Sequence, residues 1–449
     1  MNSKNPNPKR KVLIIANLFH ASPRITRLSK HLSRFGWAPT IITPKFDQDM
    51  KGLFNAPSEN LKDYDIEVIQ TGSSKSYDKQ KAEGKPYTRI SRLKNVGDAI
   101  EKDSSGRLHK IISKLYWRYY NTINFPDLEK DWKNTALDAA EKKLSEDKFD
   151  LILSSSSPII AHIVASELKK RFGIPWIGEY RDLWTLNHNY QLGPIMKILD
   201  RRLEKKTMRS ADALITTTRS WADELKGLFP EKQIFDVSTG FDTDEIPANI
   251  IPVKKFAITY TGQIYWGKQN PEPLFHALSE MSGSGELNRK DTEIRFFGPM
   301  SRETQDLSVK YGIEDLIAQK GVIPRNETIL KQAESQILLF LNWSDESQKG
   351  WLSLKFIEYL GAKRPILMIS SSKDNLMAQM MQEMNLGEIA LTDEDALHSL
   401  RRYYSEYLKN GSISFNGNLQ KINDYNIVKI AERYSEIMNN TVANPIQSR

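Results

Sequence analysis

Short apolar segments alternate with longer segments of helical periodicity along most of the chain. In the first half, the segments expected to form strands are 12–16, 40–43, 66–70, 151–154, 176–179 and 213–217. In the second half they are 256–260, 294–297, 321–323, 338–341 and 366–369, again separated by spacers of helix length. Alternation of this kind is typical of βαβ units, so the pattern predicts an α/β protein with two doubly wound parallel sheets.

A connector rich in turn-forming residues separates the two halves. It has the sequence VSTGFDTDEIPANIIPVKK, in which Gly240 and two prolines favour turns over regular structure. We therefore expect one domain over residues 1–250, a second over 251–423, and a C-terminal helix within 424–449. Within the first domain, the polar stretch 71–105 is rich in Lys and Ser and predicts a mobile insertion.

Composition indicates a large globular protein. The chain has 449 residues, 39% of them hydrophobic, which is enough for two or three domains with extensive cores. It has no cysteine, which excludes disulfides and cysteine-ligated zinc and agrees with a reducing compartment. No apolar run approaches the roughly 18 residues that span a bilayer. The polar start MNSKNPNPKR does not resemble a signal peptide, so we expect a cytoplasmic protein.

The net charge of +8 is compatible with nucleic acid, an anionic membrane surface or phosphorylated substrates as partners. The excess is spread over both halves and no nucleic-acid recognition module is visible, which disfavours the first. The segment 104–126 contains Arg107, Lys110, Lys114 and Arg118 beside an apolar helical stripe. Two interpretations remain open for it: a helix lying on an anionic membrane, or a core-packed helix with a solvated basic flank.

The segment 338–367 is the clearest candidate for chemistry. Its apolar start predicts a buried strand, and ligands of open α/β sheets bind where such strands end. A helix beginning near Leu352 would point free N–H groups at an anion there, with Lys355 in its first turn. Glu358 shares the face of Lys355 and can accept hydrogen bonds from sugar hydroxyls. Spacing alone equally allows an ordinary surface ion pair between Lys355 and Glu358.

Polar side chains also follow a predicted strand of the first half. Glu179, Arg181, Asp182 and Trp184 lie where the strand starting near Trp176 ends. Carboxylates at such a place can orient a sugar hydroxyl or assist its deprotonation. The alternative is a structural Arg181–Asp182 pair that caps the loop.

Two further candidates occupy similar places after other strands. His162 follows a turn in which Ser157 and Pro158 suit a helix start, and it either reaches the sheet edge or is partly buried. Arg24 follows the first strand and either contacts a phosphorylated acceptor or is a surface arginine.

Three blocks of the sequence resemble bacterial glycosyltransferases of family 4. The first joins PD(x)4W at 126–132 to the segment 149–184, FDLILSSSSPIIAHIVASELKKRFGIPWIGEYRDLW. The second is 258–278, ITYTGQIYWGKQNPEPLFHAL, and the third is 321–341, GVIPRNETILKQAESQILLFL, together with Lys355 and Glu358. With the connector they cover most of residues 11–370. The resemblance therefore implies the whole GT-B architecture, in which two Rossmann-like domains with parallel sheets face each other across an interdomain cleft. It also implies that the C-terminal helix within 424–449 crosses back to the N-terminal domain.

The resemblance implies retaining transfer of a sugar from a UDP- or GDP-linked donor, held by the C-terminal domain, to a glycan or lipid-linked acceptor, held by the N-terminal domain. No covalent intermediate, cofactor or obligatory metal is expected. Stabilisation of the departing diphosphate then carries most of the catalysis. The pathway implied is cell-surface polysaccharide or lipopolysaccharide synthesis on the inner face of the plasma membrane, with peripheral membrane contact.

The resemblance also assigns candidate roles to residues. The expected donor-binding residues are Gly262, Gln263, Lys268, Gly298, Ile323, Ser353, Leu354, Lys355 and Glu358. The loop beside the reacting sugar carbon is expected to contain Glu179, Arg181 and Asp182, and His162 is a further catalytic candidate. The expected acceptor contacts are Arg24, Asp127 and Trp184.

The chain departs from the family pattern at two places. Gln263 stands where many relatives have an arginine, and Gly350 stands where the widespread pattern has the first of two glutamates. A subgroup with Gly there and Lys before the Glu is more similar, although it commonly has proline in place of Ser353. The departures keep two alternatives open: a GT-B UDP-sugar epimerase, and a catalytically silent glycan-binding or scaffold subunit.

Three Asp-x-Asp triplets resemble metal-binding motifs. They are Asp63/Asp65, Asp242/Asp244 and Asp393/Asp395. Chance matches are expected among 56 acidic residues, and no His/Asp cluster has the spacing of metal ligands. We therefore expect no metal site.

Overall fold

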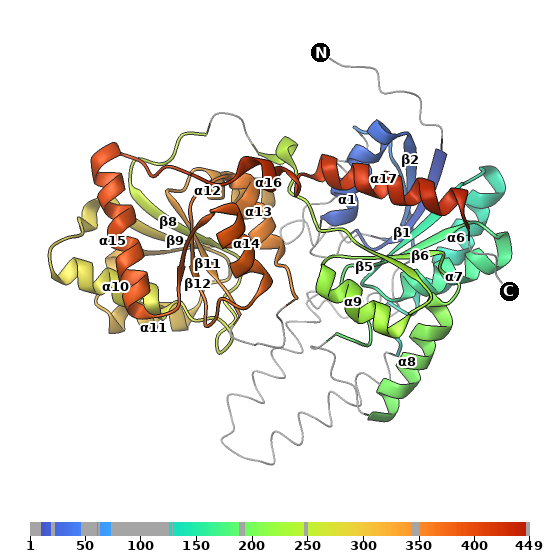
Figure 1. Ribbon diagram of the computed structural model, residues 1–449, viewed down its shortest axis with the longest axis horizontal. Coiled ribbons are helices and arrows are strands. Elements are labelled where there is room, and N and C mark those ends of the chain that lie inside the picture. Colours follow the sequence, from blue (N-terminus) through green and yellow to red (C-terminus); the bar gives the residue numbers. More distant parts are fainter. Residues whose placement is uncertain are drawn as a thin grey trace. The chain divides into compact units, whose positions relative to one another are not determined.

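The computed structural model describes residues 10–18, 23–45, 61, 63–72, 125–127, 129–187, 194–246, 250–343 and 350–445. The chain divides into two compact units (Figure 1). The first unit comprises 1–51, 56–237 and 431–449, and the second comprises 52–55 and 238–430. The insertion predicted at 71–105 and the basic segment predicted at 104–126 lie almost wholly outside the described residues.

The first unit is built on a seven-stranded parallel sheet of order β3-β2-β1-β4-β5-β6-β7. Its strands are β1 (Arg10–Ala16), β2 (Trp37–Pro44), β3 (Glu67–Thr71), β4 (Leu151–Ser156), β5 (Trp176–Tyr180), β6 (Ala213–Thr216) and β7 (Gln233–Asp236). Every residue of β4 and β5 is buried, as expected for central parallel strands covered on both faces. The order reverses between β1 and β4, and this switch point is where open sheets of this kind place their ligands.

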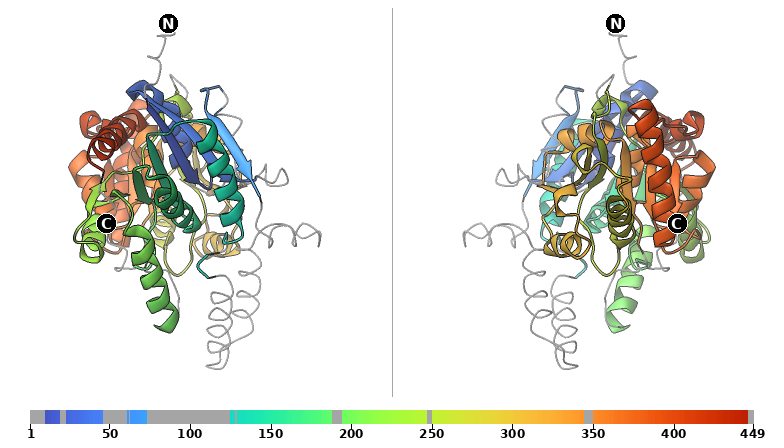
Figure 2. Two further views of the ribbon diagram at one scale, coloured as in Figure 1. Left: turned by 90° about the vertical axis from the view of Figure 1, so that its right-hand side faces the viewer. Right: turned by 90° about the vertical axis from the view of Figure 1, so that its left-hand side faces the viewer.

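Helices connect these strands (Figures 1 and 2). They are α1 (Arg24–Leu32), η1 (Ser33–Phe35), α6 (Trp132–Glu146), α7 (Ile160–Phe172), α8 (Pro194–Met208) and α9 (Arg219–Leu228). The last helix, α17 (Ile427–Ala443), begins in the second unit and belongs to the first from Ala431 onward. Among the described helices, none combines the length and hydropathy that a bilayer span requires.

The second unit is built on a six-stranded parallel sheet of order β10-β9-β8-β11-β12-β13. Its strands are β8 (Phe256–Thr261), β9 (Thr292–Phe297), β10 (Ile317–Gly321), β11 (Ile337–Leu341), β12 (Ile366–Ile369) and β13 (Gly387–Ala390). Its helices are η3 (Thr243–Glu245), α10 (Glu272–Gly283), η4 (Arg289–Asp291), α11 (Arg302–Lys310), η5 (Glu314–Leu316), α12 (Arg325–Ala333), α13 (Leu354–Ala362), α14 (Leu376–Met384), α15 (Asp393–Asn410) and α16 (Leu419–Asn423).

Alternate residues of the central strands fill two separate cores in this unit. Leu339 and Leu341 of β11 join one buried cluster, and Leu338 and Phe340 join the other. Because side chains of a strand alternate between faces, this arrangement places a core on each side of the sheet.

The prediction of two parallel α/β sheets is confirmed. The strand predicted at 321–323 is wrong, because β10 ends at Gly321, where a positive φ of 75° turns the chain. Strands β7 and β13 were not predicted. Both have only four residues and lie at a sheet edge, where the apolar signal is weak.

A buried cluster joins α1, β5 and α17 within the first unit. Arg24 forms an ion pair with Glu179, and the two side chains are 1% and 0% exposed. The Tyr434 hydroxyl accepts a hydrogen bond from Arg24 Nη2 at 2.7 Å and donates one to Glu179. Arg24 Nη2 also donates to the Val237 carbonyl at 2.6 Å. Since a buried charge needs a partner, these contacts hold together three segments that are distant in sequence.

Replacing Tyr434 with phenylalanine should destabilise the first unit. The change removes the hydroxyl between Arg24 and Glu179, and a lost hydrogen bond to a buried charge costs about 1–3 kcal/mol. Urea unfolding measured by circular dichroism should show a transition at lower urea. Tyr265→Phe, at a tyrosine that is 48% exposed, is the control and should change stability by less than about 0.5 kcal/mol. Equal stability of the two variants would contradict the assignment.

Candidate functional site

Glycines at the strand ends of the second unit let the backbone segments approach closely. Gly262 follows β8 with a φ of 103°, and its N–H donates to the Phe297 carbonyl at 2.6 Å. Gly298 follows β9, and a Cβ there would lie only 2.2 Å from the Gly262 carbonyl oxygen. Any side chain at position 298 would therefore push the two loops apart. Because neither glycine has a side chain, the backbone at this sheet edge can approach a phosphate group closely.

Lys355 lies directly against this edge. A Cβ built on Gly262 would lie 3.3 Å from Lys355 Nζ, so the glycine makes room for the ammonium group. The same Nζ lies 3.6 Å from the centroid of the Tyr260 ring. Burial lowers the pKa of Lys355 from 10.5 to about 7, although the neighbouring Glu358 carboxylate opposes the change. An anion bound here would favour the charged form.

Glu358 on α13 accepts hydrogen bonds from two side chains of the neighbouring helix α12. Its Oε1 accepts a hydrogen bond from Arg325 Nη2 at 2.6 Å, and its Oε2 accepts one from Gln332 Nε2 at 3.4 Å. Arg325 Nη2 also lies 3.4 Å from Glu245 Oε2. Burial lowers the pKa of Arg325, but Glu358 and Glu245 outweigh it and raise the pKa overall. The carboxylate of Glu358 is thus fixed in one orientation.

Arg325 and Gln332 were missed as partners of Glu358, and Glu245 was missed as a second partner of Arg325. Arg325 lies in the GVIPR segment of the third block that resembles family 4. That position was the only sequence feature that could have indicated a role for Arg325 in the site. Its contact with Glu358 depends on α12 lying beside α13, and spacing in the sequence does not reveal that.

Helix α13 begins slightly later than predicted, at Leu354 rather than near Leu352. Ser353 is its N-cap, is 7% exposed, and makes no side-chain capping bond. Ile323 follows β10 and is half-buried at the approach to α12. The first turn of α13 therefore lies at the same end of the sheet as Gly262 and Gly298.

The loop after β8 is fixed by Gln269 and carries an aromatic group. Gln269 donates to the Leu341 carbonyl at 2.6 Å, and the Gln263 carbonyl accepts from the Tyr260 hydroxyl at 2.9 Å. Lys268 Nζ lies 4.5 Å from the centroid of the Trp343 ring. The ring of Trp343 also lies 5.6 Å from that of Tyr265 and 5.3 Å from that of Trp351. These aromatic residues were not among the predicted site residues.

In the first unit, Glu179 and Arg24 are engaged with each other. The alternative of Arg24 as a surface arginine is wrong, because the residue is 1% exposed. Burial raises the pKa of Glu179, but the Arg24 guanidinium and the hydrogen bonds to the carboxylate together outweigh burial and lower the pKa overall. Roles for these two residues in catalysis or acceptor binding stay predictions.

His162 lies in the core of the first unit. It is 0% exposed, its Nδ1 lies 2.8 Å from Ser154 Oγ, and Trp176 Nε1 donates to the same oxygen at 2.7 Å. Burial lowers the pKa of His162 to about 3, even though Glu179 opposes the change. The imidazole is therefore neutral near pH 7. It is buried more completely than either interpretation of the sequence expected.

Asp182 is the most accessible of the predicted acidic residues in the first unit, with a side chain that is 47% exposed. Burial raises its pKa, and the adjacent Arg181 opposes this. Arg181 Nε lies 3.9 Å from Asp182 Oδ2, while Arg181 Nη2 donates to the Ser157 carbonyl at 3.0 Å. Asp127 instead accepts the backbone N–H of Ile160 at 2.9 Å and so caps the start of α7.

Two buried acids of α8 anchor the loop that contains Asp182. Trp184, which is 2% exposed, donates through Nε1 to Asp200 Oδ2 at 3.0 Å. Glu204 accepts hydrogen bonds from the Tyr180 hydroxyl at 3.1 Å and from the Thr185 hydroxyl. Burial raises the pKa of Glu204 from 4.5 to about 7. Neither acid was predicted, because both stand among basic residues and look like ordinary surface charges.

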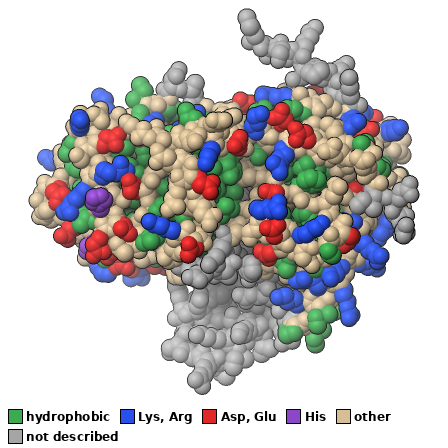
Figure 3. All heavy atoms as spheres, viewed as in Figure 1, with side chains coloured by type: hydrophobic (Ala, Val, Ile, Leu, Met, Phe, Trp, Pro, Cys, Tyr) green, Lys and Arg blue, Asp and Glu red, His purple; other side chains and the backbone are tan. Residues whose placement is uncertain are grey.

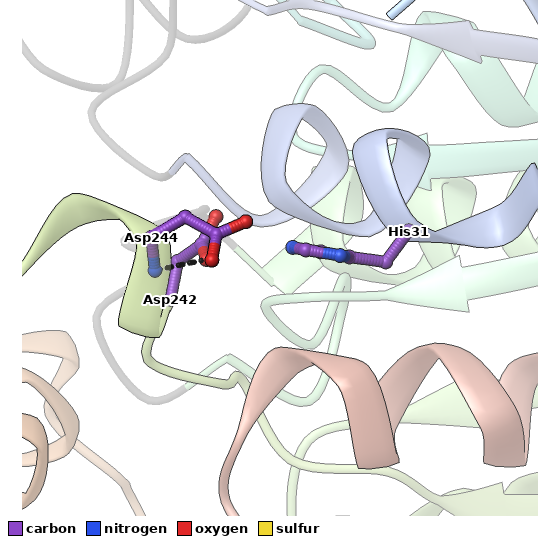
Figure 4. A group of neighbouring side chains, drawn as sticks. All are labelled: His31, Asp242 and Asp244. Atoms are coloured by element: carbon purple, nitrogen blue, oxygen red, sulfur yellow. Dashed lines mark hydrogen bonds between the residues drawn. The ribbon is translucent and has the colours of Figure 1, made fainter. Parts of the chain in front are cut away.

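Residues of the Asp-x-Asp triplets take part in local structure. In Figure 4, Asp242 Oδ1 accepts a hydrogen bond from the backbone N–H of Asp244 at 3.0 Å, which caps η3. The His31 drawn in the same figure is on α1 of the first unit. Asp395 completes a capping box with Thr392 at the start of α15, and Asp65 lies in a turn with a φ of 56°.

The stability of the first unit should depend on pH through Glu204. Between about pH 4.5 and 7, the folded protein keeps this proton and the unfolded chain releases it, so stability falls as the pH rises. One group contributes at most about 1.4 kcal/mol per pH unit. Glu204→Gln should remove that contribution in urea unfolding at a series of pH values. Glu146→Gln, at an exposed position, should keep the wild-type slope; an unchanged slope in Glu204→Gln would contradict the assignment.

Comparisons with known proteins give one family and several solved structures of one fold. Residues 104–245 match the family described as Glycosyltransferase Family 4. The solved structure of a sucrose-phosphate synthase from Thermosynechococcus elongatus is similar with a TM-score of 0.56 and 12% identity, covering 97% of this chain and 100% of that one. A glycosyltransferase from Rickettsia africae has a TM-score of 0.57 and 12% identity, with 97% and 99% coverage.

A UDP-N-acetylglucosamine 2-epimerase is also similar, with a TM-score of 0.53, 12% identity and 98% coverage of both chains. No curated protein sequence matches the chain. At 12% identity these structures establish the fold alone, and the fold is shared by transferases and an epimerase.

Proposed function

We propose that this chain, which carries a Glycosyltransferase Family 4 domain in a GT-B-like fold, transfers a sugar from a nucleoside-diphosphate sugar to a glycan or lipid-linked acceptor. The observation that carries the proposal is the meeting of Gly262, Lys355 and Glu358 at one edge of the second sheet. A glycine at a strand end, a half-buried lysine and an oriented carboxylate suit a diphosphate joined to a hydroxyl-rich sugar.

In this proposal the donor diphosphate binds between Gly262 and the first turn of α13. Lys355 supplies a full positive charge, and the free N–H groups of the helix add partial charge. Glu358, oriented by Arg325 and Gln332, accepts hydrogen bonds from ribose or sugar hydroxyls. Lys268 and the aromatic rings of Tyr265, Trp343 and Trp351 lie in neighbouring loops, where they can contact the sugar.

On the acceptor side we assign the main role to Asp182, because its carboxylate is accessible. It orients the acceptor hydroxyl, and Arg181 balances its charge. Glu179, His162 and Trp184 then act from the core as positioning residues that hold the loop.

The proposed reaction retains the configuration at the anomeric carbon and uses no metal. The acceptor oxygen bonds to that carbon on the face from which the diphosphate oxygen departs, and the acceptor proton passes to the departing diphosphate. The product is a glycoside in cell-surface polysaccharide assembly, formed in the cytoplasm at the inner face of the membrane. The Family 4 domain supports this proposal.

The Lys355→Gln variant tests the donor site. Loss of one charged contact to phosphate costs about 1.5–3 kcal/mol, so binding of the preferred donor should weaken roughly 10- to 100-fold. Calorimetry with UDP- and GDP-sugars, without and with magnesium, measures this. Lys290→Gln, at an exposed position, should bind as the wild type does. The absence of binding by folded wild-type protein would favour a silent scaffold subunit.

The same titrations should depend on pH. The pKa of Lys355 is about 7, so above pH 7 the lysine must take up a proton when the donor binds. Affinity should therefore fall by up to about tenfold per pH unit between pH 7 and 9. Lys355→Gln should remove this dependence, and its persistence in that variant would contradict the assignment.

Glu358→Gln tests catalysis. Because the carboxylate contacts a hydroxyl next to the reacting carbon, turnover should fall about 100-fold or more while the protein remains folded. Glu383→Gln on α14 is exposed and should keep full activity. Release of nucleoside diphosphate with an acceptor extract measures turnover. An epimerase would release nucleoside diphosphate without any acceptor. Wild-type turnover in the Glu358→Gln variant would contradict a catalytic role for Glu358.

A further inference from the structure

Helix α8 separates its charges by sign. Its two acidic residues, Asp200 and Glu204, are 0% exposed and bind groups of the loop after β5. Every other charged residue of the helix is a cation: Lys197, Arg201, Arg202, Lys205 and Lys206. Of these, Arg201 is half-buried and the rest are exposed. The exposed charges of α8 are therefore all positive.

The same outer surface begins with large apolar side chains. Ile195, Ile198 and Leu199 are 68%, 56% and 45% exposed. Their i, i+3, i+4 spacing places them on one helix face. At about 100° per residue, Arg202 and Lys206 continue that face toward the C-terminal end. The exposed face is thus apolar over its first turns and cationic over the next.

Helix α8 is prominent in its unit. Figures 1 and 2 show it extending beyond the neighbouring described helices α6 and α7. Figure 3 shows blue basic side chains gathered with green apolar ones over this part of the first unit. The helix is therefore placed to meet a large flat partner.

The chemistry of the face identifies that partner. Contiguous exposed apolar side chains mark an interaction surface, but a second copy of this face would bring cation against cation. An anionic lipid surface satisfies both halves, since acyl chains accept apolar side chains and headgroup phosphates bind lysine and arginine. We propose that α8 is a membrane-surface helix. Ile195, Ile198 and Leu199 enter the acyl region of an anionic bilayer, and Arg202, Lys205 and Lys206 bind its headgroups.

The inference stands on α8 alone and does not require the proposed reaction. If both are correct, they are connected through the inner face of the helix. Asp200 and Glu204 hold the loop that presents Asp182, so one helix would bind the lipid surface outside and support the acceptor loop inside.

Vesicle sedimentation with the full chain tests the proposal. The wild type should sediment with vesicles of equal phosphatidylglycerol and phosphatidylcholine, and high salt should reverse this. Each cation near such a surface strengthens binding about fivefold, so removing three should weaken it far more than tenfold. The basic-face variant combines Arg202→Gln, Lys205→Gln and Lys206→Gln. The apolar-face variant combines Ile195→Gln, Ile198→Gln and Leu199→Gln, and should weaken binding at least tenfold.

Two matched controls separate the face from bulk charge and hydrophobicity. The charge control changes three exposed lysines elsewhere in the first unit, Lys142→Gln, Lys148→Gln and Lys170→Gln. The apolar control changes three exposed residues of the second unit, Val309→Gln, Leu408→Gln and Leu419→Gln. Both should bind vesicles as the wild type does. Equal loss in a control and in its matched α8 variant would overturn the assignment to this helix.

Insertion has its own readout, because the chain has no cysteine and can be labelled at one introduced site. An environment-sensitive dye on Ile198→Cys should shift to shorter emission wavelength with anionic vesicles, and the same dye on Leu408→Cys should not. The emission shift of the dye tests the proposal even if a triple variant fails to fold. The proposal is overturned if wild type does not bind anionic vesicles. It is also overturned if the α8 variants bind them normally, or if they change only self-association in light scattering.

Discussion

The buried ion pair between Arg24 and Glu179 is the constraint on which the first unit depends. Two charges removed from water need partners, and here each charge has the other, both contact the Tyr434 hydroxyl, and Arg24 also donates to the Val237 carbonyl. The contacts join the first helix, a central strand and the last helix. Glu179 therefore serves the fold, although its position at a strand end resembles that of a catalytic acid. The carboxylate that remains accessible beside it is Asp182.

The second unit uses burial of charge differently. Lys355 has the Tyr260 ring on one side and Gly262 on the other, and burial lowers its pKa to about 7, which disfavours the ammonium form. A phosphate ligand supplies the missing counter-charge and stabilises the proton on the lysine. Glu358 is already oriented by Arg325 before any ligand binds. This edge of the second sheet therefore combines Lys355, whose charge depends on its surroundings, with Glu358, whose carboxylate is already oriented.

Sequence reasoning succeeded where structure depends on local pattern. Apolar runs identified the central strands because both faces of a parallel sheet are buried. Lys355 and Gly262 were expected near each other because both follow strands that end at the same edge of the sheet, and they do lie close together. It missed what depends on distant partners. The burial of Arg24 requires a tyrosine 410 positions away, and the pairing of Glu358 requires α12 beside α13. The inward acids of α8 were equally invisible, since a run of mixed charges does not reveal which side chains face the core.

The first unit is also discontinuous in sequence, because α17 supplies its final residues only after the whole second unit has been made. During synthesis, Arg24 and Glu179 emerge from the ribosome long before Tyr434. The second unit is continuous apart from a short segment and can complete its core earlier. The first unit therefore begins first along the chain but completes its native contacts last. A fragment that stops before Ala431 would contain the whole first sheet without the helix that satisfies its buried charges.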